Sequence, residues 1–349
     1  MKTNNAGSHH AGAFTTAWVT TKLLPLLLLL ILPGGALAQS YTNSYGIWGY
    51  MTTNATITIT TYTGSGGFVV IPNTIDGLPV ASIGYSAIAW CTNLTSMTIP
   101  DSVTSIGSEA FWGCATLASI TIPNSVTNIG VGAFVNCASM KAISVDKSNH
   151  AYSSVDGVLF NNNQTTLVEY PGGLTGSYTI SNSVTSVGDS AFMWCTNLTS
   201  ATIPDSVTHI GNEAFGACLS LSNVYFQGNA PSFGLDVFGG PKPMWDPATI
   251  FYLPGTTGWD SVSAITLVPV VLWTPQVLAS DSSFGVRTNQ FGFNINWASG
   301  MSVAVDACTD LANPTWSPII TNTLTSGTAY FGDPEWSKYP TRFYRLRWP

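Results

Sequence analysis

The amino-acid sequence predicts a β-rich repeat solenoid with a small all-β module at its C-terminal end. A 23-residue period runs through the middle of the chain, and residues 275–349 lose that period but alternate apolar and polar side chains. Only 8% of the 349 residues are charged, whereas 45% are hydrophobic. Scarce Lys, Glu and Arg argue against a helical bundle and favour short strands joined by turns.

The period is carried by a recurring pentapeptide and by the cysteines. IPDSV at residues 99–103 recurs as IPNSV at residues 122–126 and as IPDSV at residues 203–207. Five cysteines keep the same step: Cys91, Cys114, Cys137, Cys195 and Cys218. The longer gap between Cys137 and Cys195 is one regular step plus one lengthened step, so one unit carries a 12-residue insertion. Five clear units and one expanded unit predict a solenoid, in which stacked units share one core.

The residue types in each segment of a unit explain whether that segment forms a strand or a turn. Residues 117–122, LASITI, alternate apolar and polar positions and predict a short strand. Pro123 cannot donate to a sheet, so the strand should end there. The Asp or Asn that follows favours a turn, and Gly107 turns the chain again. The inward face of a short helical turn follows, made of Ala110, Phe111 and Cys114.

The unit I-P-x-x-V-x-x-I-G-x-x-A-F-x-x-C resembles the BspA-like leucine-rich repeats of secreted and surface bacterial proteins. Residues 152–173 are similar to a hairpin insertion common in that group, and residues 62–80 to its opening segment. The resemblance covers roughly residues 45–240. It implies a right-handed leucine-rich-repeat solenoid, a role in adhesion or in binding proteins or glycans, and no catalytic residues.

These patterns divide the chain into five segments. We expect a signal peptide at residues 1–38, an N-terminal β cap at 39–81, and the solenoid at 82–240 with its expanded hairpin unit at 146–180. Residues 241–274 should form a C-terminal cap, because the last repeat would otherwise expose its apolar edge. Alternation from Phe291 to Trp297 predicts a small β-sandwich-like module at 275–349.

The segment at residues 1–38 is typical of a secretory signal peptide. Lys2 and Lys22 precede an apolar run at residues 23–32, and Ala36 and Ala38 supply the small residues that a signal peptidase needs before Gln39. About 10 apolar residues are too few to span a bilayer, which takes roughly 20. We therefore expect a secreted or cell-surface protein with no transmembrane segment after cleavage.

Charge and motifs exclude several function classes. With 10 basic and 17 acidic residues, a nucleic-acid-binding surface is not expected. No C-x-x-C pair offers a zinc site, and only His150 and His209 follow the signal segment. No cofactor, metal or enzymatic activity is therefore predicted. A remote alternative is a glycan-active enzyme with paired carboxylates.

The cysteines allow two interpretations. Six cysteines in an exported chain could form three disulfides. Five of them, however, share one phase of the repeat beside Ala and Phe core positions. We therefore expect those five to stack as buried small hydrophobic residues, with Cys308 apart from them.

Candidate binding residues lie on the predicted surface. The outward strand positions form an uncharged hydroxyl face that ends at Tyr225; they are Ser96, Ser119, Ala142, Ser200 and Asn223, beside Thr98, Thr121, Ser144, Thr202 and Tyr225. Three tryptophans near the repeat cysteines could stack on sugars or anchor a partner, or simply pack between units: Trp90, Trp112 and Trp194. Three arginines near one strand could contact acidic polymers or form a solvated face: Arg342, Arg345 and Arg347.

The sequence as a whole predicts a non-enzymatic binding or adhesion protein. Its partners would be extracellular or surface proteins or polysaccharides, contacted at many points of the repeat surface. The alternative is a structural spacer that presents the C-terminal β module at the cell envelope.

Overall fold

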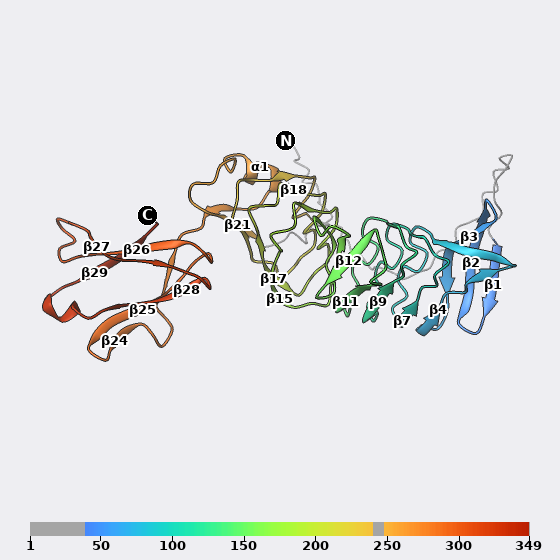
Figure 1. The fold of residues 1–349 in the computed structure, drawn as a ribbon, viewed down its shortest axis with the longest axis horizontal. Coiled ribbons are helices and arrows are strands. Elements are labelled where there is room, and N and C mark those ends of the chain that lie inside the picture. Colours follow the sequence, from blue (N-terminus) through green and yellow to red (C-terminus); the bar gives the residue numbers. More distant parts are fainter. Residues whose placement is uncertain (1–38, 240–247, 349) are drawn as a thin grey trace, which may run out of the picture. The chain divides into compact units, whose positions relative to one another are not determined.

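The computed structural model describes residues 39–239 and 248–348. The predicted signal peptide, residues 1–38, lies outside the described residues, as does the start of the predicted C-terminal cap. Figure 1 follows the chain from the blue N-terminal strands through green coils to the orange and red C-terminal strands.

An antiparallel sheet begins the described chain. It consists of β1 (Gln39–Asn43), β2 (Gly46–Thr53) and β3 (Thr56–Thr63). Strand β3 then pairs in parallel with β6 (Leu78–Ile83), whose other partners are β5 (Thr74–Ile75) and β8 (Ser105–Ile106). Trp48, Ile57 and Ile59 of this sheet are fully buried in the first repeat core. The sheet therefore covers the apolar edge of the first coil.

Each coil contributes to two series of parallel strands. The first series is β4 (Gly67–Val70), β7 (Leu94–Thr98), β9 (Ser119–Ile122), β11 (Ala142–Val145), β15 (Gly176–Thr179), β17 (Leu198–Ile203), β19 (Asn223–Phe226), β21 (Thr249–Tyr252) and β22 (Val270–Leu272). The second is β8, β10 (Asn128–Ile129), β14 (Thr166–Glu169), β16 (Ser186–Val187), β18 (His209–Ile210) and β20 (Ser232–Phe233). Paired residues such as Ile120 and Ile143 are one period apart in the sequence, which confirms that the period is the length of one coil.

The segment between the two turns of a unit has the predicted inward face but no continuous helix. Ala110, Phe111 and Cys114 are all fully buried. Two residues of this segment have positive φ in five of the units, for example Glu109 at 56° and Gly113 at 72°, and such residues interrupt a right-handed helix. The short helical turns are therefore successive tight turns, and α1 (Val262–Thr266) is the one α-helix of the described residues.

Aromatic rings stack through the core from coil to coil. Phe111 lies on Phe134 with ring centroids 5.2 Å apart. A second stack runs through Tyr170, Phe192, Phe215 and Phe238, with successive centroids 4.9, 4.7 and 5.5 Å apart. Because the same place holds an aromatic residue in each coil from Phe111 onward, the stacked rings bury their faces against neighbouring coils.

The expanded unit divides the core. Strands β12 (Tyr152–Val155), β13 (Val158–Asn161) and β14 form an antiparallel meander, and β14 then pairs in parallel with β16. The buried apolar residues fall into one cluster that ends near Leu159 and a second that begins at Val158 and ends at Val268. The insertion thus lies where one stack of coils ends and the next begins.

The C-terminal strands form two sheets around one core. The first sheet contains β23 (Gln276–Leu278), β24 (Gly285–Arg287), β25 (Gln290–Asn296) and β28 (Thr328–Asp333). The second contains β26 (Ser302–Cys308), β27 (Ser317–Thr323) and β29 (Phe343–Arg347), and η1 (Trp336–Lys338) precedes β29. Phe293 and Val305 meet in the core between the sheets, as expected for a small β-sandwich.

The segment before this module contributes to both neighbouring cores. Val262 of α1 and Trp259 pack in the last repeat core, whereas Leu253 packs in the core of the β module. The Trp297 indole N–H also donates to the Trp273 carbonyl oxygen over 2.9 Å. A cut at residue 274 would therefore expose part of the C-terminal core.

Candidate functional site

The first strand series presents an uncharged outward face. Strand residues on this face are half-buried or exposed, whereas those between them, such as Val224 and Ala201, are buried. Register places the outward residues in columns, one of which runs through Thr179, Thr202, Tyr225, Phe251 and Val271. No Asp, Glu, Lys or Arg occurs in that column, so a ligand would meet hydroxyl groups and rings rather than charges.

Three aromatic residues gather where this face ends. The Tyr225 ring stacks on Phe251 with centroids 5.2 Å apart, and the Trp273 ring lies 4.5 Å from Tyr225. All three are only half-buried, and Asn223 and Thr249 flank them in the adjacent column. We call Tyr225, Phe251 and Trp273 the aromatic end. The sequence pointed to Tyr225 alone, because Phe251 and Trp273 lie beyond the regular period.

The three candidate tryptophans differ in their surroundings. Trp90 is 64% exposed, whereas Trp112 and Trp194 are half-buried. The Trp90 ring lies against the next coil, where a Cβ on Gly113 would be 2.7 Å from it. Trp90 thus packs on a neighbouring unit with one part of its ring and exposes the rest.

Trp90 and Trp194 also have an unusual backbone conformation. Their φ angles are 62° and 60°, in the left-handed region that bulky residues rarely adopt. The same repeat position holds Gly113, Asn136 and Ala217, with φ of 72°, 61° and 57°. The coil therefore requires this conformation, and tryptophan is costly there.

Two of the three candidate arginines are paired with one buried carboxylate. Arg345 and Arg347 on β29 lie 3.1 and 2.9 Å from Asp306 Oδ2 on β26. Burial acts to raise the pKa of Asp306, but the hydrogen bonds from Arg347 and Arg345 outweigh it and lower that pKa. Arg345 also lies over the Trp316 ring, 4.6 Å from its centroid. These two charges are thus engaged within the module.

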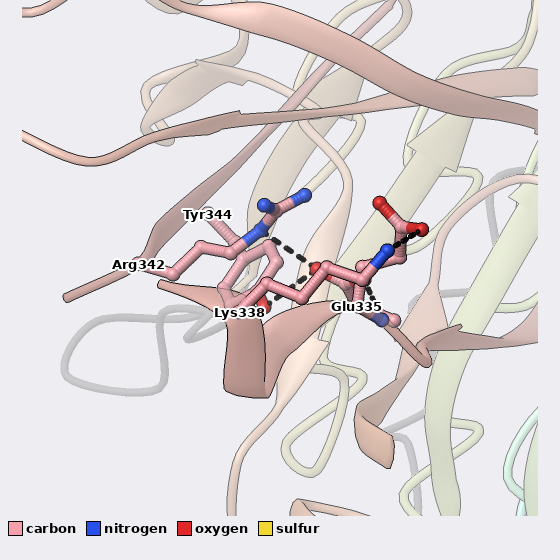
Figure 2. A network of polar contacts seen from close by, with 5 residues as sticks. Glu335, Lys338, Arg342 and Tyr344 are labelled. Atoms are coloured by element: carbon pink, nitrogen blue, oxygen red, sulfur yellow. Dashed lines mark hydrogen bonds and ion pairs between the residues drawn. The ribbon is translucent and has the colours of Figure 1, made fainter. Parts of the chain in front are cut away.

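Arg342 belongs to a separate network around Asp333 (Figure 2). Its Nε lies 2.7 Å from Asp333 Oδ2, although the N–H is not aligned for a hydrogen bond. The Tyr344 hydroxyl donates to the same carboxylate oxygen over 3.0 Å, and the Glu335 N–H donates to Oδ1 over 2.9 Å. Lys338 forms an ion pair with Glu335 at the exposed side of the network.

Glu169 is a buried carboxyl group that sequence reasoning missed. It precedes Tyr170 as Ala110 precedes Phe111, and its Oε1 accepts a hydrogen bond from the Phe134 N–H over 3.0 Å. In the other coils a backbone carbonyl accepts this bond, as Ala133 does from Phe111. Burial raises the pKa of Glu169 to about 8. A Glu in a column of alanines was the signal that could have revealed it.

Four of the five repeat cysteines are buried as predicted, namely Cys114, Cys137, Cys195 and Cys218, whereas Cys91 in the first coil is only half-buried. The thiols of Cys114 and Cys137 donate to the carbonyl oxygens of Ile88 and Phe111 in the preceding coils, over 3.2 and 3.3 Å. Both are fully buried and outside any disulfide, as expected from their phase. Burial raises the pKa of the Cys114 thiol to about 12, so it is not a nucleophile at neutral pH.

Residues 39–239 and 248–348 contain neither a metal-binding cluster nor a helix that could span a membrane. In this part of the chain, no group of three His, Cys, Asp or Glu side chains is arranged to hold a metal ion. Over the same ranges, no helix has the length and apolar character needed to cross a membrane.

Comparison with known proteins places these features in a family. The model of the BspA-type leucine-rich repeat region matches six copies, at residues 68–178 and 174–242. No curated protein matches the chain.

Three solved structures of bacterial proteins are similar to the chain. A leucine-rich repeat protein of T. pallidum is 30% identical over 59% of this chain and 92% of its own, with a TM-score of 0.39. A leucine-rich cell surface protein of Faecalibacterium prausnitzii is 20% identical over 67% and 94%, with a TM-score of 0.29. A leucine-rich repeat protein of Eubacterium ventriosum is 18% identical over 68% and 85%, with a TM-score of 0.35. The repeats that form these coils are those that the family model matches, and the chain belongs to the BspA-type leucine-rich repeat family.

Proposed function

We propose that the chain is a secreted or surface-exposed protein that binds an extracellular protein or polysaccharide through the outward face of its repeats. The family suggests a binding or adhesion role, and one of the similar structures is that of a cell surface protein. The observation that carries the proposal is the aromatic end. The half-buried rings lie beside hydroxyl and amide groups, so together they offer stacking and hydrogen bonding to an uncharged ligand.

The contact would extend beyond the rings. Outward residues recur at the same strand position in successive coils, so a repetitive ligand could meet equivalent groups on several of them. Weak contacts that repeat in this way gain affinity together. The aromatic end would then be the strongest single contact.

The test uses the full chain and a residue that the fold already accepts. A binding screen against extracellular-matrix proteins and polysaccharides identifies the ligand. Tyr225→Thr then places at this position the residue that Thr202 provides one coil earlier. We expect affinity to fall at least about tenfold, since aromatic anchors dominate binding energy, with the fold intact by circular dichroism.

A matched control lies off the outward strand face. Tyr85 is an exposed ring in a turn segment, at the repeat position that holds Ser108 in the next coil, so Tyr85→Ser should leave affinity near that of the native chain. Equal binding by the native chain and Tyr225→Thr would contradict the proposal. It would favour a structural spacer that presents the C-terminal module.

A further inference from the structure

A hollow of about 420 Å³ opens on the C-terminal module beside Arg342. It lies between the end of β26, the start of β27 and the segment after η1. Its lining consists of Ala307, Cys308, Thr309, Thr315, Ser317, Pro318, Ile319, Tyr339 and Arg342. We call it the Arg342 hollow, and it is separate from the outward face of the repeats.

Arg342 is fixed at the wall of this hollow. Its side chain is only 13% exposed, and its guanidinium carbon lies 4.0 Å from the centroid of the Tyr339 ring. The Nε side faces Asp333, and in Figure 2 the dashed line from Arg342 starts at Nε, whereas none reaches its two terminal nitrogens. A guanidinium held by one edge and one face presents its other edge in a planar fork that fits a carboxylate.

The remaining lining narrows the class of ligand. Thr309, Thr315 and Ser317 bring hydroxyl groups, whereas Pro318 and Ile319 bring apolar surface. Arg342 is the one charged residue among those described around the hollow, so no acidic lining residue opposes an anion. Arg345 and Arg347, in contrast, both point their Nε atoms at Asp306.

We infer that the Arg342 hollow binds an acidic sugar unit, such as a uronate of an acidic polysaccharide. The terminal guanidinium nitrogens would bind the carboxylate, the hydroxyl groups would bind the ring hydroxyls, and Pro318 and Ile319 would contact the apolar ring face. This site is independent of the aromatic end, because no residue is shared between them. Failure of one proposal therefore leaves the other standing.

The experiment titrates the full chain with a galacturonate trisaccharide and with the neutral galactose trisaccharide. Isothermal titration calorimetry should detect the acid, and the neutral sugar should bind at least about tenfold more weakly, because it lacks the charge-assisted pair. Added salt should weaken binding of the acid. Equal affinity for the two sugars, or no binding of the acid, would overturn the inference.

Variants locate the binding. Arg342→Lys keeps the charge but loses the planar fork, and should lower the affinity for the galacturonate trisaccharide at least about tenfold. Thr315→Val and Ser317→Ala remove exposed hydroxyl groups without touching the Asp333 network, so they test the hollow even where Arg342→Lys fails to fold. Arg345→Lys is the matched control on β29 and should bind as the native chain does. Weaker binding in Arg345→Lys alone, or binding of acidic peptides but not of acidic sugars, would contradict the assignment.

Discussion

At the scale of single residues, Glu169 takes over a hydrogen bond that the backbone makes elsewhere. At the junction with the expanded unit, the Glu169 side chain accepts the Phe134 N–H, where the other coils use a backbone carbonyl such as that of Ala133. A buried backbone N–H without a partner is costly, so the carboxyl group stabilises the junction between the two cores. Its function there requires an acceptor oxygen rather than a charge.

Glu169 should make the protein less stable at alkaline pH. The folded-state pKa of about 8 lies above the ordinary value of 4.5, so the unfolded chain loses its proton first. The stabilising contribution is complete below about pH 4.5 and is lost as the pH rises toward about 8. Glu169→Gln keeps an acceptor oxygen but cannot ionise. We expect denaturant titrations to show that the fall in unfolding free energy between those pH values, on the order of a few kcal/mol, shrinks in the variant.

The control for this prediction is Glu213→Gln, which changes an exposed carboxyl group on the same type of turn segment. It should keep the pH profile of the native chain. A Glu169→Gln profile that also matches the native one would show that Glu169 is not the titrating group.

Trp90 should be replaceable without loss of stability. Its left-handed backbone conformation costs roughly 1–2 kcal/mol for an ordinary residue, and asparagine tolerates that region better than most. Trp90→Asn, which copies Asn136 at the same repeat position, should leave the melting temperature unchanged or raise it. The control is Trp112→Asn, since that half-buried ring sits at a position without positive φ and its loss should be destabilising. Thermal denaturation distinguishes the two, and a marked loss of stability in Trp90→Asn would show that the ring contact with Gly113 outweighs the strain.

At the scale of elements, the repeat motif determines what the sequence could predict. The 23-residue period predicts the strand pairs and the buried Ala, Phe and Cys positions directly, because each coil repeats the same strand, turns and inward-facing residues. The left-handed residues were not predicted, since that position holds Trp, Gly, Asn and Ala in different units. Because the coil imposes this conformation on different residue types, no shared residue type marks the position in the sequence.

The features that the sequence did not predict arise from contacts between strands that are far apart in the sequence. Asp306 lies 39 residues before Arg345, and their pairing depends on β26 and β29 being neighbours in one sheet. The sequence therefore revealed the arginines but not the carboxylate that engages two of them. Phe251 and Trp273 joined Tyr225 for the same reason: they come together only through the register of β19, β21 and β22.

The aromatic stack should be the most sensitive element of the second core. Phe192 is fully buried between Tyr170 and Phe215, so Phe192→Ala removes two ring contacts and leaves a cavity. Such a change costs about 3–5 kcal/mol. Phe68→Ala removes an exposed ring and should cost little. Chemical denaturation measures both, and similar losses in the two variants would contradict the importance of the stack.

At the scale of the whole molecule, the expanded unit should separate two units of stability. Repeat proteins gain stability from each coil and from contacts between neighbouring coils. A destabilising substitution therefore lowers stability mainly within its own contiguous core. The first core ends near Leu159 and the second begins at Val158, with Glu169 and the antiparallel meander at their junction. A destabilising substitution in one core should therefore affect the other only weakly.

Reciprocal core substitutions test this division by hydrogen exchange. Phe192→Ala should lower the opening free energy of amides in β17 and β19 by several kcal/mol and affect β9 and β11 much less, because stability is local in solenoids. Phe111→Ala, which removes the ring that stacks on Phe134, should show the opposite pattern. Equal loss of protection on both sides of the insertion in both variants would mean that the coils open as one cooperative unit. In that case the meander, despite interrupting the second strand series, would transmit stability as fully as a regular repeat.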